Sequence, residues 1–267
     1  MPSFKDNCVH ANGACIAQSS NHGQIAAPSW LFPGSAVENA RFLNGKVNEC
    51  ELLCFEPEAP PVDELLEVGG LRWHVHLPTV LPNGNGGWGN AWDAGVERFS
   101  KACIDIYRSC SPLRPWGAVL HLPNASVKPF RSAQAMLSSF LEQWEYAGLS
   151  RADLLPENIH DASHDVFGKE LDGMDICFDV AHHFSCSGDV MPQKAILEKA
   201  ALLHWSAPCG GDAHAPLSLL TPCQTRICKA IAKLARPDAV HCIEVYELQG
   251  FWESRDILTG FMLSATL

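Results

Sequence analysis

The sequence predicts an α/β protein built as a single (β/α)₈ barrel. From about Ile25 onward, eight short β-branched or apolar runs alternate with amphipathic segments, which is the pattern of βα units around a parallel sheet. The length of 267 residues suits one such barrel. A doubly wound sheet that binds nucleotides would be expected to carry a phosphate-binding loop, and neither a G-x-G-x-x-G nor a Walker sequence is present. A closed barrel is therefore the favoured architecture.

Each predicted strand is a short apolar run bounded by turn or helix signals. In chain order the eight strands are Ala27–Phe32, Cys50–Glu56, Leu71–Leu77, Gly117–Leu122, Leu154–Asn158, Asp175–Val180, Ala201–Ser206 and Val240–Tyr246. Residues 1–24 show no periodicity and are predicted to be a flexible leader, because their Cys and His residues match no zinc template. Residues 25–267 are predicted to form the single catalytic domain.

Helices are predicted between these strands from apolar spacing and from end signals. Ala91–Cys110 places its apolar residues on one helical face. Ser132 is predicted to cap a second helix that Gly148 ends, and Thr221 with Pro222 supplies the N-cap and first-turn residues of a third. These segments fit the crossover helices that a parallel barrel requires.

Composition excludes several classes of protein. The hydrophobic fraction of 47% and the charged fraction of 18% are those of an ordinary globular chain, and no apolar run is long enough to span a membrane. The first 24 residues contain no continuous apolar run of the kind found in signal peptides, so a cytoplasmic location is expected. The net charge of −11 and the lack of Lys/Arg-rich blocks argue against a nucleic-acid partner. Oligomeric state stays open.

The twelve cysteines are interpreted mainly as reduced core residues. They are scattered through apolar stretches, and no C-x-x-C pair occurs anywhere in the chain. Neither a zinc ribbon nor a thioredoxin-like motif is therefore supported. Any bound metal is expected to be held mainly by histidine and carboxylate.

The C-terminal ends of the predicted strands carry an unusual concentration of histidines and carboxylates. They are His74 and His76 on the third strand, His121 on the fourth, Glu157 on the fifth, Asp179, His182 and His183 at the sixth, His204, Asp212 and His214 at the seventh, and Glu244 on the eighth. Barrel enzymes place their chemistry at this rim, so residues distant in sequence converge there. Any one of them alone is more often a satisfied core polar group. Together they indicate a metal site.

Neutral imidazole and carboxylate are the ligands that Zn²⁺ prefers, with Mn²⁺, Fe²⁺ or Co²⁺ as alternatives. Four carboxylates and several histidines buried together without a cation would cost far too much desolvation energy. The pattern therefore predicts a cluster of divalent ions, with zinc as the first choice. No Ser/His/Asp arrangement with a G-x-S-x-G motif competes with it.

The ordered set resembles the xylose-isomerase-like barrels, and among them the three-zinc phosphodiesterases typified by endonuclease IV, over roughly residues 27–259. The resemblance implies two to three metal ions. It assigns His76, His121 and Glu157 to the first, Glu157, Asp179, His204 and Glu244 to the second, and His182, Asp212 and His214 to the third. Glu157, Asp179 and Glu244 are then the residues at the centre of catalysis. The related sugar isomerases generally do without the third group. Two doublets stay open, since His74 could replace His76 and His183 could replace His182.

The third strand is followed by a Gly-rich segment, Pro82–Asn90, that places Trp88 and Trp92 near the rim. It is either a surface loop with one anchoring Trp or a mobile lid that stacks on a large ligand. We assign Trp88, Trp92, His74 and His183 to substrate binding on the second interpretation.

Three stretches, CELLCFEPE, LRWHVHLPTVLP and VLHLP, resemble the cobamide-remodelling phosphodiesterases of the CbiR type. That resemblance implies a corrinoid substrate whose nucleotide-loop phosphodiester is hydrolysed. The alternatives are a sugar isomerase or epimerase, an endonuclease IV-like enzyme acting on abasic DNA, and a non-catalytic cobamide- or metal-binding protein.

Overall fold

The computed structural model describes residues 24–124, 130–159, 164–209 and 213–263, and in it eight parallel strands close into a barrel. The strands are β1 (Gln24–Pro28), β2 (Glu49–Leu53), β3 (Arg72–His76), β6 (Ala118–His121), β7 (Leu154–Glu157), β8 (Ile176–Asp179), β9 (Ala200–His204) and β12 (Val240–Cys242). Neighbours in the barrel are neighbours in the chain, and β12 pairs with β1 to close it. The predicted barrel and its eight strands are confirmed. The predicted leader lies outside the described residues, except for Gln24, which begins β1.

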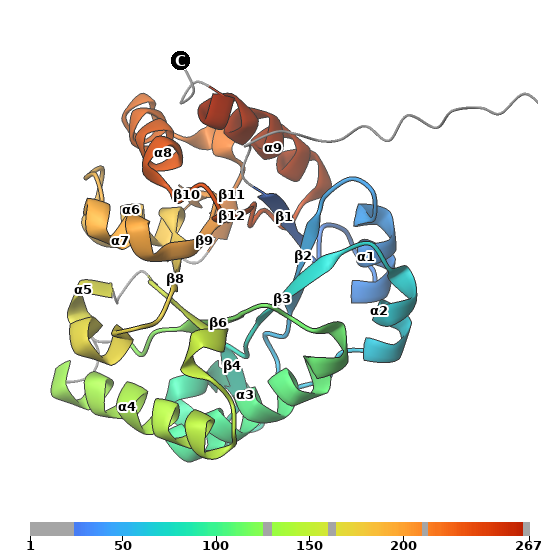
Figure 1. The fold of residues 1–267 in the computed structure, drawn as a ribbon, viewed down its shortest axis with the longest axis vertical. Helices are drawn as coiled ribbons and strands as arrows, with labels where there is room; N and C mark the ends of the chain where they lie inside the picture. The colour runs from blue at the N-terminus through green and yellow to red at the C-terminus, as the bar shows by residue number, and fades with distance from the viewer. Residues whose placement is uncertain (1–23, 125–129, 160–163, 210–212, 264–267) are drawn as a thin grey trace, which may run out of the picture.

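Helices surround the barrel on its outer side (Figure 1). They are α1 (Ala36–Leu43), α2 (Val62–Val68), α3 (Val96–Cys110), α4 (Phe130–Tyr146), α5 (His164–Phe167), α6 (Val180–Ser187), α7 (Lys194–Lys199), α8 (Pro222–Leu234) and α9 (Leu248–Leu263). Thr221 caps α8 as predicted, with Pro222 in the first turn and Gln224 completing a capping box. Among the described helices, none is long and apolar enough to cross a membrane.

Two predicted helix boundaries were wrong. The segment Ala91–Cys110 is not one helix, because Gly95 adopts a φ of 93° and separates the 3₁₀ turn η1 (Ala91–Ala94) from α3. Ser132 does not cap α4, because the helix already runs at Phe130. Gly148 follows the end of α4 with a φ of 79°, as a helix-ending glycine should.

Two hairpins that the sequence did not predict extend the C-terminal ends of the strands. After β3, the chain forms β4 (Val80–Pro82) and β5 (Trp88–Asn90), and after β9 it forms β10 (Ala207–Cys209) and β11 (Ala213–Ala215). The first hairpin is the Gly-rich segment, and Asn83 stabilises its turn by accepting hydrogen bonds from the backbone of Asn85 and Gly87. Both hairpins therefore lie at the rim where barrel enzymes bind their substrates.

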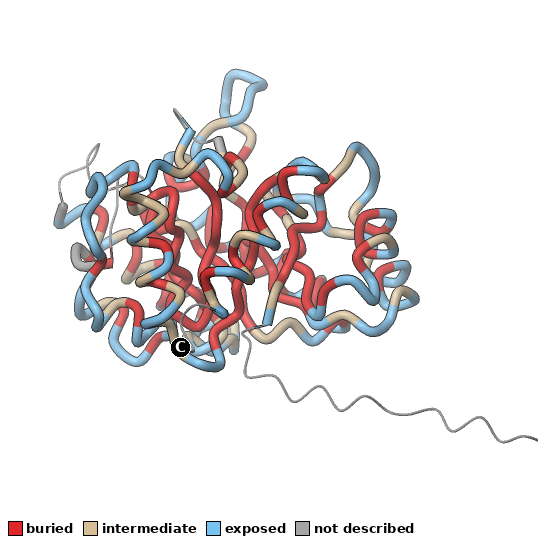
Figure 2. The backbone as a smooth tube through the Cα atoms, turned by 90° about the horizontal axis from the view of Figure 1, so that it is seen from above, coloured by how far each residue is buried: buried red, intermediate tan, exposed pale blue. Residues whose placement is uncertain are grey.

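Buried residues fill the strands and the inner faces of the helices, and exposed residues lie on the periphery (Figure 2). A large apolar cluster packs the strands against the helices, and a smaller one fills the barrel interior. Strand register sets which polar residues meet at the rim. His121 lies opposite Glu157, and Asp179 lies opposite His204. The closed barrel thus brings these histidines and carboxylates together from distant parts of the sequence.

Candidate metal centre

A cavity of about 530 Å³ opens at the C-terminal ends of the strands. Its lining combines metal-ligand residue types with aromatic and apolar side chains: Phe55, Glu56, His76, Thr79, Val80, Asn90, His121, Ile159, His182, His214, Glu244 and Tyr246. Five of these are predicted site residues. The first hairpin contributes Val80 and Asn90, so it borders the cavity directly.

The first ligand group forms around one oxygen of Glu157. His121 Nε2 lies 3.1 Å and His76 Nε2 lies 3.4 Å from Glu157 Oε2. The other ring nitrogen of His76, Nδ1, lies 3.0 Å from the backbone oxygen of Leu77, which fixes its proton there and leaves the Nε2 lone pair facing the carboxylate. His76 and Glu157 are almost fully buried, whereas His121 is partly open to the cavity.

The second ligand group forms around the other oxygen of Glu157. His204 Nδ1 lies 2.8 Å from Glu157 Oε1 and 3.1 Å from Glu244 Oε2. Asp179 belongs to the same group, since its ligand atom and those of Glu157, His204 and Glu244 all lie within 4.8 Å of one another. Tyr246 donates a 2.7 Å hydrogen bond to Glu244 Oε1 and so orients that carboxylate. Glu157 therefore faces both groups at once.

Asp179 is held in place by its neighbours in the barrel. Asn158 donates through Nδ2 to the backbone oxygen of Asp179 at 2.8 Å and accepts from its backbone nitrogen at 2.9 Å. Asp179 also caps α6 by accepting a hydrogen bond from the backbone nitrogen of His182. Burial raises the pKa of Asp179 to about 8, with His214 opposing the rise and the nearby carboxylates of Glu157 and Glu244 adding to it. A cation at this position would restore the ionised form.

His182 and His214, the described members of the predicted third group, lie on the outer side of the cavity. Their ring centroids are 5.4 Å apart. His214 Nδ1 is 2.9 Å from Ser206 Oγ and 3.7 Å from Glu244 Oε2, which ties this pair to the second group. The predicted third ligand, Asp212, lies outside the described residues.

Unpartnered buried atoms test whether cations fit these groups. The buried side-chain atoms without a hydrogen-bond partner include His76 Nε2, Glu157 Oε2, Asp179 Oδ2 and Glu244 Oε2. Leaving such atoms unpaired in the interior costs free energy, which a bound cation would recover. Their lone pairs face one another instead of facing donors. The donor set of imidazole and carboxylate suits zinc and the alternatives named above.

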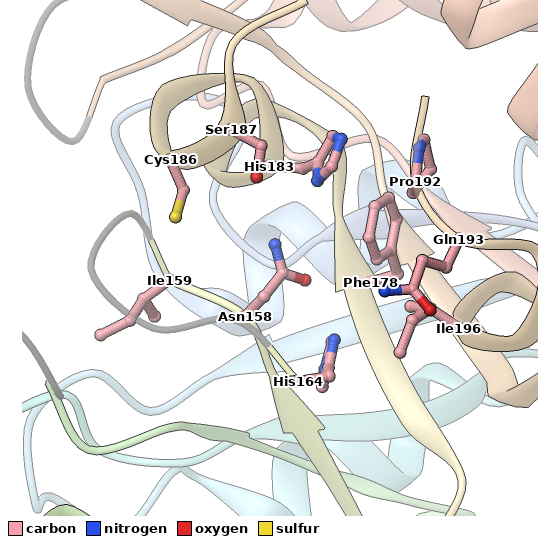
Figure 3. Close-up of a pocket in the computed structure, with 10 residues that line it drawn as sticks. All are labelled: Asn158, Ile159, His164, Phe178, His183, Cys186, Ser187, Pro192, Gln193 and Ile196. Atoms are coloured by element: carbon pink, nitrogen blue, oxygen red, sulfur yellow. The ribbon is translucent and has the colours of Figure 1, made fainter. Parts of the chain in front are cut away.

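The four residues that were predicted to bind substrate do not line the cavity. His183 faces a separate hollow of about 70 Å³ between β8 and α6, where it packs against Phe178 and its Nε2 lies 2.8 Å from the backbone oxygen of Val190 (Figure 3). His74 is fully buried below the rim. Trp92 is also buried, whereas Trp88 is half exposed on the first hairpin and is absent from the lining.

Two residues that the sequence analysis did not single out belong to the site. Tyr246 lines the cavity. The Oε1 atom of Glu51 lies 3.1 Å from His204 Nε2. The signal for Glu51 was a glutamate near the start of a predicted buried strand, where a charge is costly unless it is paired. Glu51 does not lie at the C-terminal end of its predicted strand, where the site residues were sought.

The fold is similar to that of solved enzymes of one barrel superfamily. A D-tagatose 3-epimerase-like protein is 16% identical, with a TM-score of 0.65 over 91% of this chain and 98% of that one. Endonuclease IV from Thermus thermophilus is 16% identical, with a TM-score of 0.62 over 90% and 99%. A xylose isomerase domain protein from Alicyclobacillus acidocaldarius is 12% identical, with a TM-score of 0.61 over 92% and 100%. The chain therefore has the xylose-isomerase-like TIM-barrel fold.

No family model and no curated protein matches the sequence. A further similar structure, the IOLI protein with a binding zinc atom, is 11% identical with a TM-score of 0.51 over 91% of this chain and 96% of that one. Structures with this fold thus include one that binds zinc. In the part of this chain that the structure describes, buried His, Glu, Asp and Cys clusters could hold metal ions.

Proposed function

We propose that this protein is a metal-dependent phosphodiesterase that works at the two ligand groups sharing Glu157. One observation supports this most directly. Glu157 Oε2 faces His76 and His121, whereas Glu157 Oε1 faces His204. A carboxylate that presents its two oxygens to two separate donor groups suits a bridge between two cations. Paired cations of this kind are typical of enzymes that cleave phosphodiesters.

The bound cations would supply charge neutralisation for a phosphodiester and activation of water. The residues of this chain would hold the cations and orient their ligands. His76, His121 and Glu157 would form the first site, and Glu157, Asp179, His204 and Glu244 the second. His182 and His214 lie where a third cation or a phosphoryl oxygen would be bound. Tyr246 keeps Glu244 in place through its hydroxyl.

A sugar isomerase or epimerase is the second candidate, because the fold is also similar to that of a D-tagatose 3-epimerase-like protein. Such an enzyme would use one or two metals and would generally do without the third group. His182 and His214, whose ring centroids are 5.4 Å apart, with His214 Nδ1 3.7 Å from Glu244 Oε2, therefore favour the phosphodiesterase. Metal counting and product analysis separate the two candidates.

For the substrate we propose the nucleotide-loop phosphodiester of a cobamide, in line with the sequence resemblance. The cavity of about 530 Å³ mixes apolar and polar lining, as suits a ligand that is broad and amphipathic. The net charge of −11 would repel a nucleic-acid polyanion. The first hairpin, with Trp88 half exposed, borders the opening from one side.

Metal content and cleavage together test the proposal. Protein purified without chelator should carry about two to three divalent ions per chain and should release a cobinamide-type product from a cobamide. Abasic duplex DNA should stay intact even at low salt, where electrostatic attraction is strongest. Elemental analysis that finds less than about one ion per chain after reconstitution would contradict the metal centre. Cleaved abasic DNA with inert cobamide would favour a repair nuclease instead.

The His214→Ala substitution is expected to lower phosphodiester cleavage by about 100-fold or more, because His214 contributes to the outer group that faces the leaving oxygen. A two-metal sugar isomerase that does without the third group would lose much less. Initial rates on bis-nitrophenyl phosphate and on the cobamide measure the effect. A His214→Ala enzyme with undiminished activity would favour the isomerase alternative.

The Trp88→Ala substitution is expected to raise the KM for the cobamide several-fold, because an exposed ring beside the opening can stack on a large substrate. Cleavage of the small substrate bis-nitrophenyl phosphate should change little, since Trp88 is absent from the lining of the cavity in which that molecule would bind. Steady-state kinetics on both substrates provide the comparison. Equal losses on the two would show that Trp88 has no part in recognising the larger one.

A further inference from the structure

A second set of donor atoms lies inside the barrel, below the cavity. It comprises Glu51, His74, His204 and Cys242, all four of them fully buried. One ligand atom from each residue lies within 4.8 Å of the others. Apart from His204, none of them belongs to the two groups that share Glu157. The set therefore needs its own physical explanation.

Strand register brings these four residues together. Glu51 on β2 lies opposite His74 on β3, and Cys242 on β12 lies opposite His204 on β9. The strand between β2 and β12 is β1, and Ala26 on it faces the barrel interior. Because Ala26 has a small side chain, Glu51 can reach Cys242 across β1, and its Oε2 lies 3.5 Å from Cys242 Sγ.

The measured separations are close to those between ligands of one cation. Glu51 Oε1 lies 3.1 Å from His204 Nε2 and 3.5 Å from His74 Nε2. Metal–ligand bonds of about 2.0–2.3 Å in a tetrahedron place neighbouring donor atoms about 3.3 to 3.8 Å apart. These three atoms are nonetheless buried without an aligned hydrogen-bond partner. They lie close to one another without forming hydrogen bonds, as is expected of atoms that would share a cation.

His74 also has the supporting partner expected of a metal-binding histidine. Its Nδ1 lies 2.7 Å from Glu49 Oε1, which places the ring proton on that side and leaves Nε2 unprotonated toward Glu51. Glu49 is itself held by Trp116, whose Nε1 donates to the same oxygen, and by Arg72 at 3.6 Å from Oε2. A carboxylate that orients a histidine in this way is a recurring feature of zinc sites.

We propose that Glu51, His74, His204 and Cys242 form a buried site for one divalent cation, with zinc as the best match. One thiolate, two imidazoles and one carboxylate are a donor set that zinc accepts in tetrahedral geometry. The thiolate and the carboxylate would together balance the charge of the cation. Four protein ligands leave no open position, so the site is structural and ties four barrel strands together beneath the cavity.

His204 lies between this site and the second group of the cavity. Its Nδ1 faces Glu157 and Glu244, and its Nε2 faces Glu51. With a cation on each side, His204 would hold both through its two ring nitrogens. Loading the buried site would then fix the orientation of His204 toward the cavity.

Cobalt substitution tests the site through its sulfur. The full-length protein, freed of metal and reloaded with Co²⁺, should show a near-ultraviolet thiolate-to-cobalt charge-transfer band, because Cys242 is a ligand. Cys242→Ser should remove that band and about one equivalent of bound cobalt. Cys103→Ser is the matched control, since Cys103 on α3 is equally buried and belongs to none of the clusters of described residues that could hold a metal ion. It should keep both the band and the cobalt.

The outcomes separate this site from the proposed function. A band that survives Cys242→Ser, or one that disappears with Cys103→Ser instead, would overturn the assignment. His74→Asn provides a second variant, which should lose the same equivalent of cobalt while keeping the visible absorption of cobalt bound by His76, His121 and the cavity carboxylates. Absence of visible cobalt absorption in His74→Asn, where the buried equivalent has been removed, would instead count against the cavity site.

Discussion

Replacing Glu157 by Gln should lower phosphodiester cleavage by more than about 100-fold. Loss of an outer partner of a metal ligand already costs up to about 100-fold, and Glu157 is assigned as a ligand itself. Glu157 is the residue that both cavity groups share, with Oε2 near His76 and His121 and Oε1 near His204. An amide offers one oxygen and one nitrogen donor, so it cannot bridge two cations. Initial rates on bis-nitrophenyl phosphate measure the loss of activity, and elemental analysis of the same samples measures the loss of bound metal.

The matched control is Glu58→Gln, the same chemical change at an exposed position beyond β2. It should leave metal content and activity near those of the unsubstituted protein. The far-ultraviolet circular dichroism of Glu157→Gln should remain native, because the substitution preserves shape. Near-normal turnover by Glu157→Gln, with full metal content, would refute the bridging role and with it the assignment of the two groups.

The barrel and most of the cavity ligands could be predicted because they follow simple periodicities. Alternating side chains place every second residue of a strand in the barrel interior, and parallel strands end at one rim. His76, His121, Glu157 and Asp179 each stand at the last position of their observed strands. Glu244 follows β12 by two residues, which keeps it on the same side of the chain as Cys242.

The two histidine doublets required three-dimensional information. His74 and His76 point to the same side of β3, and only the position of the rim shows that His76 borders the cavity and His74 lies below it. His182 and His183 are consecutive on a helix, where one residue turns the side chain by about 100°. His182 therefore faces the cavity and His183 the separate hollow beside Phe178.

The buried cluster below the cavity could not be predicted from the sequence, because its four residues come from four different strands. The sequence analysis assigned no role to Glu51 and interpreted Cys242 as a core cysteine. Only the closure of β12 against β1 brings them within 3.5 Å of each other. Strand order and register are tertiary properties, so residue spacing along the chain cannot supply them.

Replacing Trp92 by Ala should lower the free energy of unfolding by about 3–5 kcal/mol, the usual cost of removing a large buried aromatic side chain. Trp92 is only 3% exposed and packs between two helices, with its ring centroid 4.6 Å from that of Phe99 and 5.6 Å from that of Phe140. Its Nε1 donates a 3.0 Å hydrogen bond to the backbone oxygen of His121. Denaturant unfolding followed by circular dichroism measures the loss.

The same measurement on Trp88→Ala separates packing from substrate contact in the Gly-rich segment. Trp88 is 50% exposed on the hairpin, so its removal should change the free energy of unfolding by no more than about 0.5 kcal/mol. Because Trp92 holds the backbone of a first-group ligand, Trp92→Ala should also weaken metal binding at His121, whereas Trp88→Ala should not. A Trp92→Ala protein with unchanged stability and a higher KM for the large substrate would return Trp92 to the role of a stacking residue.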